Sequence, residues 1–176
     1  MYKEKLLILG KSGSGKNFTC ESLVKEGLKQ LVKETTRPKR KGETQGIDYN
    51  YIDDKEFLYK LENGHFLTYQ SFKIDKETTW YYGISKEEFE KCDMLQVTPG
   101  ELDEILKIVD RDRCFVVYLD IDKDVREERI LERNDNNDSL KRRLEQDDKD
   151  FSVNIDFDLK ISDPYFETGL ILDLIE

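Results

Sequence analysis

The stretch that decides the fold is Lys5-Leu6-Leu7-Ile8-Leu9-Gly10-Lys11-Ser12-Gly13-Ser14-Gly15-Lys16-Asn17. Its first half is a short apolar run, typical of a buried strand. Its second half matches G-x-x-x-x-G-K, a loop whose backbone N–H groups surround phosphate oxygens at the start of a helix. Apolar residues then recur at helical spacing over residues 17–31. A chance glycine-rich turn is the alternative, but the strand before it and the helix after it favour a nucleotide-binding α/β domain.

The predicted ATP site comprises Gly10, Lys11, Ser12, Gly13, Ser14, Gly15, Lys16 and Asn17. Lys16 is expected to reach the β and γ phosphates. The next position usually holds a Ser or Thr whose hydroxyl contacts Mg²⁺, and here it is Asn17. Because an amide oxygen can also ligate Mg²⁺, Asn17 is the candidate metal ligand. We expect Mg²⁺ to be held mainly by nucleotide phosphates and water.

Further strands are expected at residues 31–35, 48–52, 65–72, 80–82, 94–97, 115–119 and 159–161. Helices are expected over residues 53–64, 85–92, 98–109, 123–133 and 139–148, with another after residue 164. Strands that alternate with helices through short connections predict a mostly parallel sheet covered by helices. The strands between residues 48 and 82 interrupt this alternation and indicate an inserted small sheet.

The 176 residues carry 39 Asp and Glu against 29 Lys and Arg, a net charge of −10. Such a chain is a poor partner for nucleic-acid polymers or anionic membranes. No apolar run is long enough to span a bilayer, and no signal-peptide pattern is present at the N-terminus, so a cytoplasmic protein is expected. Residues 1–41, however, hold eleven Lys and Arg against four Asp and Glu, a local charge of +7. Anionic nucleotides are therefore compatible with this acidic chain.

Metal-binding and redox residues are few. Cys20, Cys92 and Cys114 are widely spaced and are interpreted as reduced core residues. His65 is the only histidine, which leaves almost nothing for a histidine metal site or a catalytic triad, and it is interpreted as structural.

A basic loop follows, Thr35-Thr36-Arg37-Pro38-Lys39-Arg40-Lys41-Gly42-Glu43-Thr44-Gln45-Gly46-Ile47-Asp48-Tyr49. Arg37 and Arg40 carry planar, permanently charged donor groups, and Tyr49 adds a hydroxyl. A lone basic loop is usually a solvated turn. Next to a phosphate loop, a second phosphate site is the more economical interpretation.

This loop resembles the acceptor-phosphate loop of the guanylate kinase family, and Tyr81-Tyr82-Gly83 resembles the family's Tyr-Tyr-Gly turn. The resemblance implies that Arg37, Arg40, Tyr49 and Tyr82 hold the phosphate of a nucleoside monophosphate.

The resemblance extends to the family's lid. Arg129 and Arg133, four residues apart, and Arg143 in Lys141-Arg142-Arg143-Leu144 resemble arginines of this mobile segment. The resemblance implies that they, with Lys16, stabilise charge on the transferring phosphoryl group. Pairing with neighbouring glutamates on a solvated helix is the alternative.

The guanine pocket of the family does not carry over. Thr68 stands where the family has a base-binding glutamate, Ile84 where it has a serine, and Gln96 and Thr98 where it has acids. Thr68, Ile84 and Thr98 are still the expected base-contacting positions. Loss of a carboxylate leaves the donor groups of a buried guanine unpaired. The pocket therefore binds guanine through other contacts, or it binds a different base or a modified base.

The expected fold is a P-loop NTPase fold, a single guanylate-kinase-like domain over residues 1–176. Its core is predicted at 1–35, 91–126 and 147–176, its NMP-binding subdomain at 36–90 and its lid at 127–146. The expected reaction is transfer of the γ-phosphoryl group of ATP, with Mg²⁺, to GMP or dGMP. Two alternatives are a P-loop kinase with a different phosphorylated acceptor and a non-catalytic guanylate-kinase-like binding module. Lys16 and the lid arginines count against the module.

Overall fold

The computed structural model describes residues 4–132 and 140–175. The chain divides into two compact units, which we call the core unit (Met1–Gln30 with Asp93–Glu176) and the insert unit (Leu31–Cys92). Each is described separately. In the described residues no helix has the length and apolar character needed to cross a membrane.

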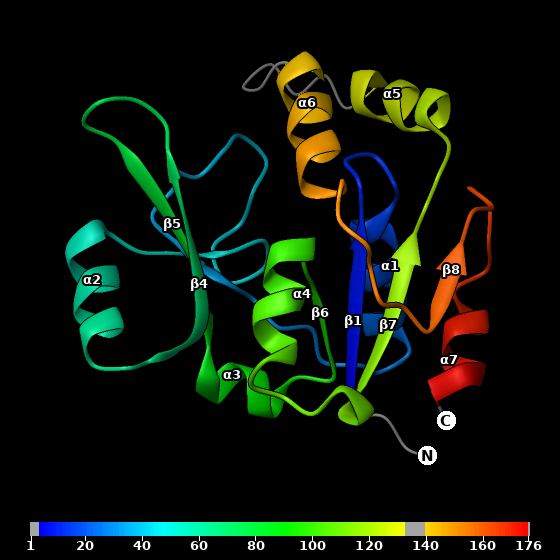
Figure 1. Ribbon diagram of the computed structural model, residues 1–176, viewed down its shortest axis with the longest axis horizontal. Coiled ribbons are helices and arrows are strands. Elements are labelled where there is room, and N and C mark those ends of the chain that lie inside the picture. Colours follow the sequence, from blue (N-terminus) through cyan, green and yellow to red (C-terminus); the bar gives the residue numbers. More distant parts are fainter. Residues whose placement is uncertain (1–3, 133–139, 176) are drawn as a thin grey trace. The chain divides into compact units, whose positions relative to one another are not determined.

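The core unit contains a four-stranded sheet in the order β6-β1-β7-β8, with every neighbouring pair parallel. The strands are β1 (Lys5–Gly10), β6 (Met94–Gln96), β7 (Cys114–Leu119) and β8 (Leu159–Ile161). The helices are α1 (Lys16–Lys25), α4 (Pro99–Leu106), α5 (Lys123–Glu132), α6 (Leu140–Asp150) and α7 (Gly169–Ile175), with a short 3₁₀ turn at Arg111–Arg113. The expected parallel sheet with helices on it is confirmed (Figure 1).

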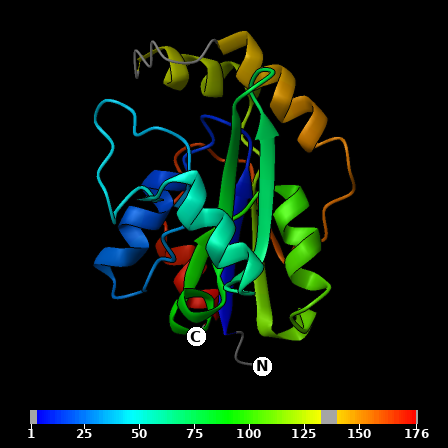
Figure 2. The same cartoon turned by 90° about the vertical axis from the view of Figure 1, so that its left-hand side faces the viewer.

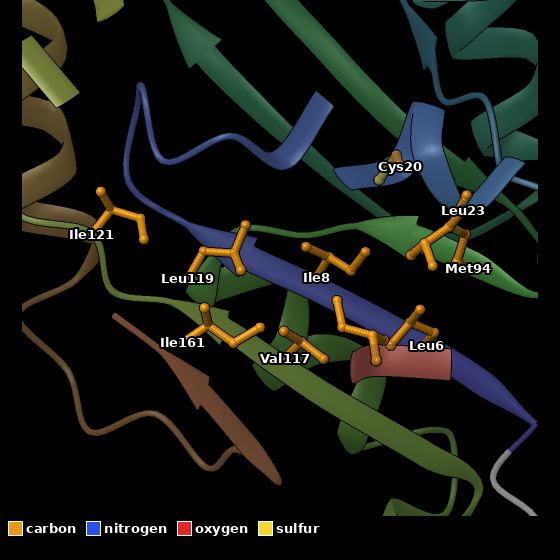
Figure 3. Packing of buried hydrophobic residues seen from close by; sticks show 10 residues of the cluster. Leu6, Ile8, Cys20, Leu23, Met94, Val117, Leu119, Ile121 and Ile161 are labelled. Atoms are coloured by element: carbon orange, nitrogen blue, oxygen red, sulfur yellow. The ribbon is translucent and has the colours of Figure 1, made fainter. Parts of the chain in front are cut away.

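All six residues of β1 are buried, as expected of a central parallel strand covered on both faces. Leu6 and Ile8 point to one face, where they join Val117 and Leu119 of β7 (Figure 3). Helices α1 and α7 cover this face through Cys20, Leu23 and Ile171. Helix α4 lies on the opposite side of the sheet (Figure 1). The core therefore fixes the end of β1, from which the phosphate loop departs.

Helix α1 is shorter than the pattern of apolar residues predicted. It ends at Lys25, and the expectation that it continues to about residue 31 is wrong. Gly27 has φ 104° and donates its N–H to Val24 O at 3.0 Å, while Leu28 donates to Leu23 O at 3.1 Å. This pair of bonds is the usual glycine-dependent termination of a helix. Leu28 then packs against the core from outside the helix.

The insert unit contains a second sheet in the order β3-β2-β5-β4. Its strands are β2 (Glu34–Thr35), β3 (Asn50–Tyr51), β4 (Phe66–Lys73) and β5 (Thr79–Ser85), and its helices are α2 (Asp54–Glu62) and α3 (Lys86–Lys91). The predicted inserted small sheet is present, with antiparallel β2–β5 and β4–β5 pairs and a parallel β2–β3 pair.

Helix α2 covers one face of this sheet (Figures 1 and 2). Its Phe57 is fully buried and stacks on Phe66 and Tyr81, with ring centroids 4.4 and 5.3 Å apart. Asp53 caps the helix as predicted, accepting the Glu56 N–H at 2.8 Å. His65, expected to be structural, lies 2.8 Å from Glu34 Oε1. The prediction for the cysteines is confirmed, since all three are buried and none of them forms a disulfide.

Candidate nucleotide-binding sites

The phosphate loop joins β1 to α1 in the core unit. Gly15, at φ 97°, precedes the first residue of the helix, and Lys16 folds back over the loop. Its Nζ donates to Gly10 O at 2.5 Å and to Lys11 O at 3.1 Å. Gly13 has φ 78°, and a Cβ there would lie 2.5 Å from the Arg126 carbonyl oxygen. The loop therefore needs glycine where α5 approaches it.

A carboxylate of α6 is bonded to this loop. Asp147 accepts the Ser12 N–H at 2.9 Å and the Ser12 hydroxyl at 3.1 Å. Arg126, which is buried, donates to Ser12 O at 3.3 Å and lies 3.8 Å from Asp147. Next to it, Asp148 pairs with Lys11 at 2.9 Å. No sequence pattern indicated these contacts, because acidic residues on a highly charged helix are usually solvated.

Arg129, predicted from the lid resemblance, also contacts the phosphate loop. It donates to Gly13 O at 3.4 Å and to Pro164 O at 2.7 Å. Arg133 lies outside the described residues, and so does the side chain of Arg143, whose backbone belongs to α6. The catalytic roles of these arginines stay predictions.

A cavity of about 580 Å³ opens beside the loop. It is lined by Ser14, Gly15, Phe18, Thr19, Arg129, Glu132 and residues 164–166. Its volume is in the range of small-molecule sites, and the rings of Phe18, Tyr165 and Phe166 provide flat surface for an aromatic ligand. The motif alone did not predict these aromatic residues, because residues 164–166 follow β8 far along the chain.

In the insert unit, Arg37 is buried rather than displayed on a solvated turn. Its side chain is only 3% exposed and donates to Glu43 Oε1 at 2.7 Å and to Pro38 O at 2.9 Å. The guanidinium lies 5.4 Å from the ring centroid of Tyr49 and 5.7 Å from that of Tyr51. The predicted pair of Arg37 and Tyr49 is thus brought together, within an aromatic enclosure.

Glu43 and Tyr51 were not among the predicted site residues. Glu43 Oε2 accepts the Tyr51 hydroxyl and the Arg40 N–H, both at 2.7 Å. Burial alone would raise the pKa of the Glu43 carboxyl, but the hydrogen bonds from Arg37, Tyr51 and the Arg40 N–H lower this pKa to about 2. Glu43 is therefore ionised at neutral pH and fixes both arginines of the loop. Glu43 belongs to the Gly-Glu motif of the sequence, but the hydrogen-bond partners of its carboxylate depend on how the loop folds.

Tyr82 completes this group. Its ring centroid lies 5.8 Å from that of Tyr49, in an edge contact. Burial raises the pKa of the Tyr82 hydroxyl, so this group is a neutral donor at neutral pH. Arg37, Tyr49 and Tyr82 therefore form one cluster, and Arg40 is tied to it through Glu43. Convergent guanidinium and hydroxyl donors suit a phosphate group.

A profile of the guanylate kinase family matches residues 2–171. The chain belongs to the guanylate kinase family. A guanylate kinase from Helicobacter pylori is 30% identical over 148 residues, covering 79% of this chain and 69% of that protein. One from Clostridioides difficile is 35% identical over 89 residues, covering 49% of this chain but only 41% of that protein.

The crystal structure of a guanylate kinase from Anaplasma phagocytophilum matches with a TM-score of 0.64 at 19% identity. It covers 99% of this chain and 84% of the other. The expected P-loop NTPase fold is thereby confirmed.

The residues expected to contact the base, Thr68, Ile84 and Thr98, lie on different elements. Thr68 and Ile84 lie opposite each other on β4 and β5, and Gln70 lies opposite Tyr82. Because side chains alternate along a strand, these four share one sheet face, opposite to that of Tyr81 under α2. Thr68 and Ile84 are buried. Thr98 belongs to the core unit, where its hydroxyl caps α4 by accepting the Glu101 N–H at 3.2 Å.

Proposed function

We propose that this protein is a nucleoside monophosphate kinase that transfers the γ-phosphoryl group of Mg·ATP to GMP or dGMP, giving ADP and GDP or dGDP. The observation that carries the proposal is the cluster of Arg37, Tyr49 and Tyr82 held by Glu43 in a chain that also has a complete phosphate loop. A nucleotide-binding module alone would need only one of these two anion sites.

On this proposal the donor nucleotide binds in the core unit. The phosphates replace the carbonyl oxygens of Gly10 and Lys11 as partners of Lys16, and the base enters the cavity beside Phe18 and Tyr165. Loop residues after Ser12 supply backbone N–H groups, and the dipole of α1 adds positive potential. Arg129 is already bonded to the loop and is placed to neutralise phosphate charge together with Arg133 and Arg143.

The acceptor binds in the insert unit, with its phosphate on Arg37, Arg40, Tyr49 and Tyr82 and its base near Thr68 and Ile84. An ionised oxygen of the acceptor phosphate attacks the γ-phosphorus, and the β–γ bridging oxygen leaves with the electron pair of the broken bond. No general base is required, because the nucleophile is already ionised. Lys16, the arginines and the Mg²⁺ carried by ATP compensate the charge, so catalysis rests on alignment and electrostatics.

The base pocket favours a second candidate, a kinase for a different nucleoside monophosphate or another small phosphorylated acceptor. Thr68 offers one hydroxyl where two base donors need acceptors, and Ile84 is apolar and buried. The overall charge of −10 supports free nucleotides over nucleic-acid polymers or membranes as partners.

The test is ADP formation from Mg·ATP with each common ribo- and deoxynucleoside monophosphate. Greatest activity with GMP or dGMP is the expected result, with Lys16→Met as the inactive control. A different best acceptor overturns the substrate and supports the second candidate. If no acceptor is phosphorylated, a non-catalytic binding module replaces the kinase.

A further inference from the structure

The metal position beside the phosphate loop has an unusual donor set. In P-loop NTPases, Mg²⁺ is held by a hydroxyl after the loop lysine and by an Asp from a neighbouring strand. Here the hydroxyl position is Asn17, at the start of α1. The neighbouring strand is β6, whose last residue, Gln96, lies opposite Ile8 of β1 in the parallel pair. Both positions therefore hold neutral amides.

These two amides are bonded to each other. Gln96 Nε2 donates to Asn17 Oδ1 at 3.1 Å, so the one atom of Asn17 able to ligate a metal already accepts a hydrogen bond. Cys20 lies one turn further along α1 and also interacts with Gln96. Asn17 and Gln96 together bring no negative charge to the metal position.

This donor set does not fit a Mg²⁺ ion held by the protein. Mg²⁺ binds in proteins mainly through carboxylates, phosphates and water. In residues 4–132 and 140–175, no group of three or more His, Cys, Asp or Glu is arranged to hold a metal. A carboxylate at residue 96 would attract Mg²⁺, but it would repel the nucleotide phosphates whenever the metal was absent. The amide does neither.

We propose that the Asn17–Gln96 amide pair makes nucleotide binding by this chain independent of Mg²⁺, so that the loop binds metal-free ATP and Mg·ATP with similar affinity. The proposal rests on the proposed function only in requiring that the loop binds a nucleotide. By linkage, the bound nucleotide then holds Mg²⁺ no more tightly than the free nucleotide does.

The experiment is calorimetric titration of the full chain with ADP and with a non-hydrolysable ATP analogue, in excess EDTA and in excess Mg²⁺. The wild type is expected to give dissociation constants that agree within about threefold. Gln96→Glu has the same shape but adds one negative charge. This substitution should weaken nucleotide binding in EDTA by about tenfold, as expected for one added charge near phosphate, and excess Mg²⁺ should restore the affinity. Gln96→Ala is the neutral control and should remain independent of Mg²⁺.

A second variant restores the usual metal ligands. Asn17→Ser with Gln96→Asp should create Mg²⁺-dependent binding, and circular dichroism checks that each variant is folded. If wild-type binding is more than tenfold tighter in Mg²⁺ and Asn17→Ala removes the difference, the amide pair is a metal site and the proposal is overturned, while the proposed kinase stands. If the wild type binds no nucleotide in either buffer, both proposals fail.

Discussion

Nη2 of Arg37 lies 2.7 Å from Oε1 of Glu43, and the two side chains are only 3% and 18% exposed. The arginine expected to meet the acceptor phosphate is therefore already held by a carboxylate of its own loop. Glu43 is oriented in turn by the Tyr51 hydroxyl. Such fixation lowers the entropy lost when a ligand binds.

Replacing Glu43 should impair binding of the acceptor more than binding of ATP. Glu43→Gln removes the charge opposite a buried guanidinium, and we expect the acceptor KM to rise about tenfold, because a lost charged hydrogen bond is worth about 1.5–3 kcal/mol. Tyr51→Phe, which removes only the hydroxyl, should raise it about threefold. Steady-state kinetics with each substrate varied in turn measures both effects. An unchanged acceptor KM in Glu43→Gln contradicts the positioning role.

Arg37→Ala should raise the acceptor KM further, since this removes the guanidinium that we propose binds the acceptor phosphate. The ATP KM should change little, because the phosphate loop belongs to the other unit. If the acceptor KM and turnover both stay at wild-type values, Arg37 has no part in the acceptor site.

The ionised Glu43 should make the insert unit sensitive to acid. Its pKa falls from 4.5 to about 2 on folding. A carboxyl with a depressed pKa stabilises the fold fully above its unfolded value, and this stabilisation is lost as the pH falls from about 4.5 to about 2. The loss should be at most about 3 kcal/mol. Trp80, the single tryptophan, lies on β5 and reports unfolding by fluorescence. Glu43→Gln should have a flatter profile between these pH values, and an equal slope in both proteins would show that Glu43 is not the titrating group.

The bond between α6 and the phosphate loop should affect the affinity for ATP. Asp147→Asn removes the charge that faces Ser12 and Arg126, and we expect ATP to bind about threefold to tenfold more weakly, because the first half of the loop loses its anchor. Asp148→Asn is the matched control. Its carboxylate is 72% exposed, and such surface pairs contribute about 0–1 kcal/mol. Equal effects of the two substitutions would argue against a specific anchor at Ser12.

Gly83 should be required for packing rather than for backbone conformation. A Cβ at this position would overlap the Phe66 ring at Cε1 and Cδ1. We therefore expect Gly83→Ala to destabilise the insert unit by about 1–3 kcal/mol, the usual cost of overpacking. Adding Phe66→Leu should recover part of this loss, because the two sites share one contact. Denaturant unfolding followed by Trp80 fluorescence measures both, and additive losses would rule out the clash.

Much of this protein followed from short-range patterns. The run from Lys5 to Lys16 specified a buried strand, a glycine turn and a helix, and all three are present. The cap at Asp53 was equally local and is also present. The predicted helix at α1 was too long because the apolar spacing continues past Gly27, whereas the backbone hydrogen bonds of Gly27 and Leu28 decide where the helix ends.

Only the tertiary structure decided which distant side chains contact the phosphate loop. Ser12 and Asp147 are 135 residues apart, and Asn17 and Gln96 are 79 apart. No local sequence pattern predicts such pairs. A polar side chain is expected to be solvated unless the tertiary structure brings a hydrogen-bond partner next to it. The parallel pairing of β1 with β6 brings Gln96 beside the loop. The sequence by itself determined that this chain has a phosphate loop, and the packing of distant elements decided which charges surround it.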